Sequence, residues 1–67
     1  MPDGSGHADV AGTLMRDNGG FVLRADRGVS IRLLLHRVPV DLVEKRVQVT
    51  GLWIDEYTIE ADGVAPI

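Results

Sequence analysis

The amino-acid sequence predicts an all-β domain of five strands with one short helix between the third and the fourth strand. Three observations predict this class. Two turns, at Asn18-Gly19 and at Gly28, separate stretches in which apolar and polar residues alternate with a period of two. The period changes after Leu35, where a short helical segment is expected. Alternation returns at Val47 and continues past a further turn. With 67 residues, the chain has room for one core only.

The N-terminal segment differs in composition from the rest of the chain. Residues 1–8 are rich in Gly, Ser, Pro and Asp, so we expect a flexible tail there and a single domain over residues 9–67. The first strand is expected to begin at Asp9 or Val10. Gly12 inside this strand predicts a bulge or a sharp bend, because glycine has no side chain to pack.

The stretch 21–35 predicts the second and third strands as a hairpin. With Gly28 in the left-handed position of its turn, Leu23 lies opposite Ile31. The preceding turn at Asn18-Gly19 gives the same alternation independently. The first three strands therefore share one apolar face, which we expect to form the core. Its residues are Val10, Leu14, Phe21, Leu23, Ile31, Leu33 and Leu35.

The short helix is expected from Pro39 to about Lys45, because proline is favoured at the first helical position. Leu42 and Val43 would pack on the sheet, whereas Asp41 would face water. The segment is too short to be stable as an isolated helix, so it depends on this packing.

The last two strands are expected on either side of a turn at Asp55-Glu56. Residues 47–51 alternate as a fourth strand, but its terminal glycine can shift the alternation beyond it, which leaves the orientation of Trp53 open. The rest of the chain would extend the fifth strand. Val64 and Ile67 are expected to close the core.

The segment that leads into the fourth strand carries a resemblance to a known fold. Residues 45–51, KRVQVTG, resemble the basic residue and V-x-V-x-G pattern of many OB-fold domains, and Gly12 in the first strand fits the same fold. The resemblance covers residues 10–64 and extends to small uncharacterised bacterial OB-like domains. It implies a five-stranded Greek-key barrel. The alternative is an SH3-like barrel, which usually lacks a helix between its third and fourth strands.

The resemblance to OB-folds also implies where a ligand binds. The usual site is the outer face around strands two and three, with the loops after strands one and four. The predicted register puts Arg24 and Arg32 on adjacent strands of this face. Although the net charge is −3, residues 16–46 hold all seven basic side chains, so we expect weak binding of single-stranded DNA or RNA. The candidate nucleic-acid-binding residues are Arg16, Arg24, Arg32, Arg37, Trp53 and Tyr57.

The small number of aromatic residues limits this hypothesis. Proteins that bind single strands stack bases on aromatic rings. Phe21 is expected to face inward, and the acidic Asp55-Glu56 lies between the other two rings, Trp53 and Tyr57. These two rings would alternatively pack at the end of the barrel, and the arginines would alternatively form a solvated outer face.

Apolar residues on the same face support a second hypothesis. Met15, Val22 and Leu34 would lie together there as an exposed patch. The domain would then be a protein-interaction or self-association module with a protein partner or a second copy, and with neither nucleic-acid binding nor catalysis. The tail or the curl of the first strand would alternatively cover these residues.

We expect no enzymatic activity, metal or cofactor. His7 and His36 are distant from each other, so they form neither a base with an orienting partner nor a metal site. No glycine-rich phosphate loop occurs. The chain has no cysteine, no signal-peptide pattern and no long apolar run, so we expect a soluble cytoplasmic domain with no membrane partner.

Overall fold

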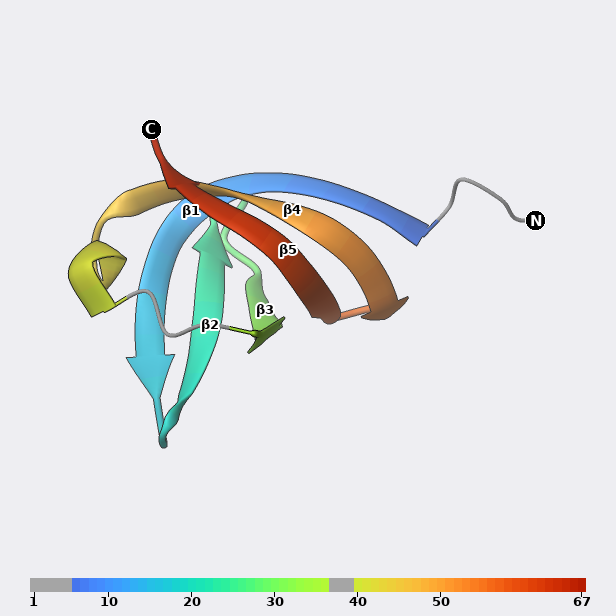
Figure 1. The fold of residues 1–67 in the computed structure, drawn as a ribbon, viewed down its shortest axis with the longest axis horizontal. Coiled ribbons are helices and arrows are strands. Elements are labelled where there is room, and N and C mark those ends of the chain that lie inside the picture. Colours follow the sequence, from blue (N-terminus) through green and yellow to red (C-terminus); the bar gives the residue numbers. More distant parts are fainter. Residues whose placement is uncertain (1–5, 37–39) are drawn as a thin grey trace.

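The computed structural model describes residues 6–36 and 40–67. Its five strands close into a barrel in the order β1-β2-β3-β5-β4 (Figure 1). The elements are β1 (His7–Asp17), β2 (Gly20–Ala25), β3 (Ser30–Leu35), the 3-10 turn η2 (Val40–Leu42), β4 (Arg46–Asp55) and β5 (Thr58–Pro66). The all-β, five-stranded prediction is confirmed. Among the described residues, no helix has the length and apolar character needed to cross a bilayer.

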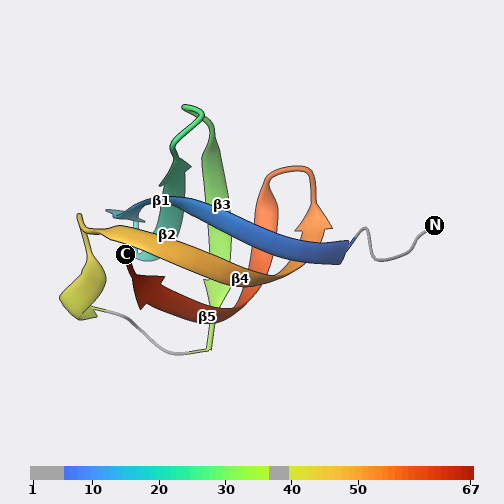
Figure 2. The same ribbon diagram turned by 90° about the horizontal axis from the view of Figure 1, so that it is seen from above.

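The strand order is not the order of the chain, and this arrangement closes the barrel. β4 pairs with β1 instead of β3, and β5 inserts between them as the parallel neighbour of β3 and the antiparallel neighbour of β4. Figure 2 shows β1, β4 and β5 running side by side while β2 and β3 cross them. Closure therefore depends on pairs that are far apart in the sequence.

The register predicted for the first three strands is confirmed. Leu23 pairs with Leu14 on β1 and with Ile31 on β3. The turn residues Asn18-Gly19 have φ values of 50° and 84°, as a two-residue hairpin turn of this kind requires. Gly28 has a φ of 94° and donates its N–H to the carbonyl oxygen of Ala25 at 2.8 Å. Local turn chemistry thus sets the register of both hairpins.

Two glycines allow backbones to approach closely where the barrel bends. Gly12 pairs with both Ala25 on β2 and Val47 on β4, at the overlap between the part of β1 that pairs with β2 and the part that pairs with β4. A Cβ at Gly12 would lie 2.8 Å from the Cα of Ala25. Gly51 pairs with Ala61, where the register of β4 and β5 shifts, and a Cβ there would also lie 2.8 Å from the Cα of its partner. This close approach requires glycine at position 12, although the pairing of β1 shows no bulge there.

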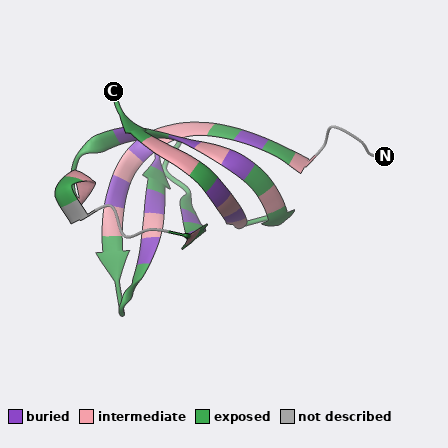
Figure 3. Ribbon diagram, in the orientation of Figure 1, coloured by how far each residue is buried: buried purple, intermediate pink, exposed green. Residues whose placement is uncertain are grey.

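The core contains side chains from all five strands, and buried residues recur at every second position in β2, β3 and the first part of β4 (Figure 3). Most of the predicted inward face is buried, whereas Val10, Leu35 and Val64 are partly buried and pack against the core. Ile67 is 66% exposed, so the expectation that it closes the core is wrong. The buried residues are Ala8, Leu14, Phe21, Leu23, Ala25, Ile31, Leu33, Val47, Val49, Ile59 and Ala61.

The predicted helix before the fourth strand is wrong. Among its described residues, 40–45, only the 3-10 turn η2 forms, and Glu44 follows in the left-handed region with a φ of 67°. Two backbone groups of this segment form hydrogen bonds with β1 and not within a helix. The N–H of Glu44 donates to the carbonyl oxygen of Leu14, and the N–H of Leu14 donates to the carbonyl oxygen of Lys45. Pairing with β1 therefore competes successfully with helix formation. Leu42 and Val43 pack against the core as expected, and Pro39 lies outside the described residues.

The strand boundaries differ from the predictions at two places. β1 begins at His7 instead of Asp9, and Ala8, assigned to the tail, is buried and pairs with Gly51 of β4. Residues 1–5 of the expected tail lie outside the described part of the chain. The last turn is Glu56-Tyr57 instead of Asp55-Glu56, because Asp55 pairs with Thr58.

Candidate functional site

One row of paired residues crosses the outer face of all five strands. Each member is in register with the next, from the end of β1 to the end of β4. Arg32 occupies the centre of the row, so it lies between the β1–β2 hairpin and the β4–β5 turn. The row consists of Met15, Val22, Arg32, Thr58 and Asp55.

Arg16, Arg24 and Arg32 are exposed at the end of β1 and on β2 and β3. Arg24 pairs with Ser30, two residues before Arg32, so the two arginines are diagonal neighbours on one face. Within the described part of the chain, none of the three forms an ion pair. Their guanidinium groups are therefore available to an anionic ligand. The fourth candidate, Arg37, lies outside the described residues.

Three shallow hollows follow one another across this outer face. Val22 and Asp17 line both the hollow beside Arg24 and the next one, which reaches β3. Arg32 lines this second hollow and also the third, at the β4–β5 turn. The shared residues make the hollows a continuous track, which we call the arginine track.

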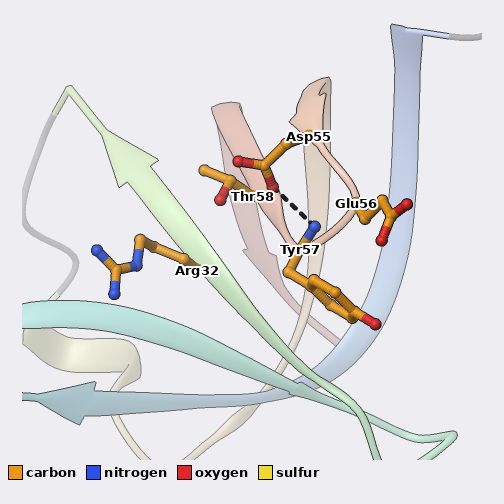
Figure 4. A pocket seen from close by; sticks show the side chains of 5 residues that line it. All are labelled: Arg32, Asp55, Glu56, Tyr57 and Thr58. Carbon is orange, nitrogen blue, oxygen red and sulfur yellow. Dashed lines mark hydrogen bonds between the residues drawn. The ribbon is translucent and has the colours of Figure 1, made fainter.

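The β4–β5 turn at the end of the track is held by two hydrogen bonds. The N–H of Tyr57 donates to Oδ1 of Asp55 at 2.8 Å, as in an Asx turn. The N–H of Arg32 donates to the carbonyl oxygen of Tyr57 at 2.7 Å. Figure 4 shows the Tyr57 ring and the Arg32 guanidinium pointing away from each other, one on either side of Thr58. The turn is thereby anchored to β3.

The carboxylate of Asp55 is stabilised in its charged form. The N–H of Tyr57 lowers the pKa of Asp55 from its ordinary value of 3.8, with the hydroxyl of Thr58 acting in the same direction and the positive charge of Arg32 contributing less. Asp55 is therefore ionised at neutral pH. Together with Asp17 and Glu56, it adds negative charge to the track.

The two candidate aromatic residues differ in their surroundings. Trp53 pairs with Ile59, is half-buried and packs against the core, as its alternative interpretation expected. Tyr57 is 60% exposed and lines the hollow at the β4–β5 turn. Of these two rings, Tyr57 is therefore the one presented to a ligand.

The structure brings the three candidate interaction residues together, with unequal exposure. Met15 and Val22 pair directly and are half-buried, whereas Leu34 is 45% exposed. The apolar patch on the β1–β2 side is thus smaller than expected. Thr58, which joins Arg32 to Asp55 in the row, was missed because the parallel pairing of β3 with β5 leaves no local sign in the sequence.

Within residues 6–36 and 40–67, no three His, Asp or Glu side chains gather in a way that would hold a metal ion. Sequence comparison adds a family match. A sequence model described as "Protein of unknown function (DUF5818)" matches residues 11–67. A search of the curated proteins gave no match, and neither did a search of the solved structures.

Proposed function

Because the chain belongs to the DUF5818 family, whose description names no activity, we propose a function from the barrel itself. The domain is a small, non-catalytic binding module, and single-stranded nucleic acid is its ligand. The nucleic acid lies along the arginine track on the outer face of β1, β2 and β3. The absence of cysteine from the sequence favours the reducing cytoplasm as its location.

The topology supports classifying the barrel as an OB-fold. The crossover that places β5 between β3 and β4 is a Greek-key connection in a five-stranded barrel, which is the OB architecture. In that architecture, oligonucleotides bind the face of strands two and three and the loops that follow strands one and four. The arginine track occupies these elements in the present chain.

The single observation that carries the proposal is the combination of cations and an aromatic ring along one track. Arg16, Arg24 and Arg32 have no partner among the described residues, and guanidinium groups bind phosphate through paired N–H donors. Tyr57 offers an exposed ring at the end of the track, and stacking contributes about 1–3 kcal/mol per base. Neither interaction depends on base identity, so we expect little sequence preference.

The same geometry predicts weak, salt-sensitive binding. Three phosphate contacts give a slope of roughly −2 for the logarithm of the binding constant against that of the salt concentration. Only one exposed ring supplies stacking, and the carboxylates of Asp17 and Glu56 repel phosphate at the two ends of the track. The hydrogen bonds to Asp55 partly shield its charge.

A titration of the full chain with labelled single strands tests the proposal. Fluorescence anisotropy is measured with oligothymidine and oligouridine at low and moderate salt. We expect binding that weakens with salt, and we expect Arg24→Glu and Arg32→Glu each to reduce it by at least about tenfold, because repulsion replaces a phosphate contact.

Lys45→Glu is the matched control, since it changes the charge equally and Lys45 lines none of the three hollows. Absence of binding at low salt would contradict the proposal. So would an equal loss of binding in Lys45→Glu, which would indicate only a response to net charge.

A further inference from the structure

A second surface lies beside the arginine track, on the outer face of β3, β5 and β4. Leu34 on β3 pairs with Glu60 on β5, and Glu60 pairs with Leu52 on β4. Leu34 is 45% exposed and Leu52 is 50% exposed, whereas Glu60 between them is half-buried. Two exposed leucines thus flank a carboxylate in one row across three neighbouring strands.

The charges around this row favour a partner with both signs of charge. Arg32 precedes Leu34 by two residues on β3, so it lies on the same face and diagonal to Glu60. Within the described residues, neither Arg32 nor Glu60 forms an ion pair. A surface that holds one cation, one anion and exposed leucines is complementary to itself.

We propose that this surface, formed by Arg32, Leu34, Leu52 and Glu60, binds a second copy of the chain. A two-fold axis that runs diagonally over Leu34 and Thr58 brings Arg32 against the partner's Glu60, and Glu60 against the partner's Arg32. The same axis packs Leu34 against the partner's Leu34. The contact is isologous, with leucine at its centre and ion pairs beside it.

The small size of the surface determines how strong the association is. Stable interfaces bury about 800 Å² per partner, which is the contribution of roughly 20–30 residues. Four residues on three strands form a much smaller contact. The dimer is therefore a weak and reversible complex, populated at high protein concentration.

Charge exchange tests the contact directly. Sedimentation equilibrium of the full chain across a concentration series should show a mass that rises from 7.3 kDa toward twice that value. Arg32→Glu and Glu60→Arg should each raise the dimer dissociation constant by at least about tenfold, because like charges then face each other. An equimolar mixture of the two variants should associate again, since each introduced side chain meets its opposite charge in the other chain.

If association recovers in the mixture, Arg32 of one chain contacts Glu60 of the other. An effect of either substitution within its own chain would not be reversed by mixing. Leu34→Ser should also weaken association, whereas Ile67→Ser, at an exposed isoleucine outside the surface, should not. Circular dichroism establishes that each variant is folded. A wild-type chain that stays monomeric overturns the proposal, as does a mixture that associates no better than its components.

Discussion

Arg46, the first residue of β4, donates two hydrogen bonds to the carboxylate of Asp26 in the turn that follows β2. The Nη1–Oδ1 and Nη2–Oδ2 distances are 3.0 and 2.7 Å, so both nitrogens of the fork are used. The N–H of Asp26 also donates to the carbonyl oxygen of Ala11 on β1, at 3.3 Å. This ion pair connects the β2–β3 turn to the start of β4.

Removing this ion pair should cost little stability. The side chains of Arg46 and Asp26 are 57% and 48% exposed, and exposed pairs contribute about 0.2–1 kcal/mol. Urea unfolding of Arg46→Ala, Asp26→Ala and the double variant gives the coupling energy between the two residues. We expect a coupling within that range that shrinks in high salt. A coupling of zero at low salt would show that the bidentate geometry contributes nothing.

Alanine at Gly12 should destabilise the barrel strongly. Its Cβ would lie 2.8 Å from the Cα of Ala25 and would also collide with the carbonyl oxygen of Arg24, and backbone atoms cannot rotate away. We expect a loss of about 1–3 kcal/mol or more in urea unfolding. Gly20→Ala is the control, because a Cβ there has only an ordinary contact at 3.6 Å, and it should be neutral or stabilise by up to about 1 kcal/mol. Equal effects at both positions would refute the steric explanation.

Truncation of Leu23 and truncation of Leu34 should have different effects on stability, because the two residues lie on opposite faces of the β2–β3 hairpin. Leu23 is fully buried, so Leu23→Ala should cost about 2–5 kcal/mol, a large part of the stability of a small domain. Leu34 is exposed, and Leu34→Ala should change the stability of the monomer by no more than about 0.5 kcal/mol. Thermal unfolding at low concentration measures both. A folded domain that is indifferent to Leu23→Ala would be inconsistent with the register.

The lowered pKa of Asp55 predicts a loss of stability in acid. The folded chain holds this carboxylate charged below its ordinary pKa of 3.8, whereas the unfolded chain takes up a proton there. The contribution is fully present above 3.8 and disappears as the pH falls through the lowered value. Asp55→Asn should lack this part of the pH dependence in urea unfolding. An NMR titration of the Asp55 carboxyl with its midpoint at or above 3.8 would argue against the hydrogen bonds as its cause.

Binding of a single strand and binding of a second copy should compete, because Arg32 belongs to both proposed surfaces. Adding oligothymidine to the associated wild-type chain should reduce the protein mass measured by sedimentation toward that of the monomer. Arg24→Glu lies outside the self-association surface, so this variant should dimerise normally and respond less to the oligonucleotide. Binding without any change in association would show that the two surfaces are independent.

The part of the fold set by local chemistry could be predicted from the sequence. Asn18-Gly19 and Gly28 determine two turns within a few residues, and the alternation on either side then determines which side chains face inward. The same alternation was enough to place Arg24 and Arg32 together on the outer face. Here, the local and the tertiary preferences agree.

The remaining features depend on partners that are distant in the sequence. The helix expected from Pro39 to Lys45 does not form, because the backbone groups of Glu44 and Lys45 form hydrogen bonds with Leu14 on β1. Ala8 is buried where β1 pairs with β4, and its partner Gly51 is 43 positions away. Thr58 joins the candidate site through the parallel pairing of β5 with β3, and the exposed row of the self-association surface arises from the same pairing. No local pattern carries this information.

The parallel pairing of β3 with β5 also determines how the chain reaches its final structure. Residues 32–35 of β3 pair with residues 58–61 of β5, and the whole of β4 lies between these two segments in the sequence. Folding that depends on such distant pairs is slow, in the range of milliseconds to seconds. Until β5 arrives, the first three strands have an uncovered apolar face and an unpaired edge on β3. In an incompletely folded chain, this edge of β3 is therefore open to pairing with another chain.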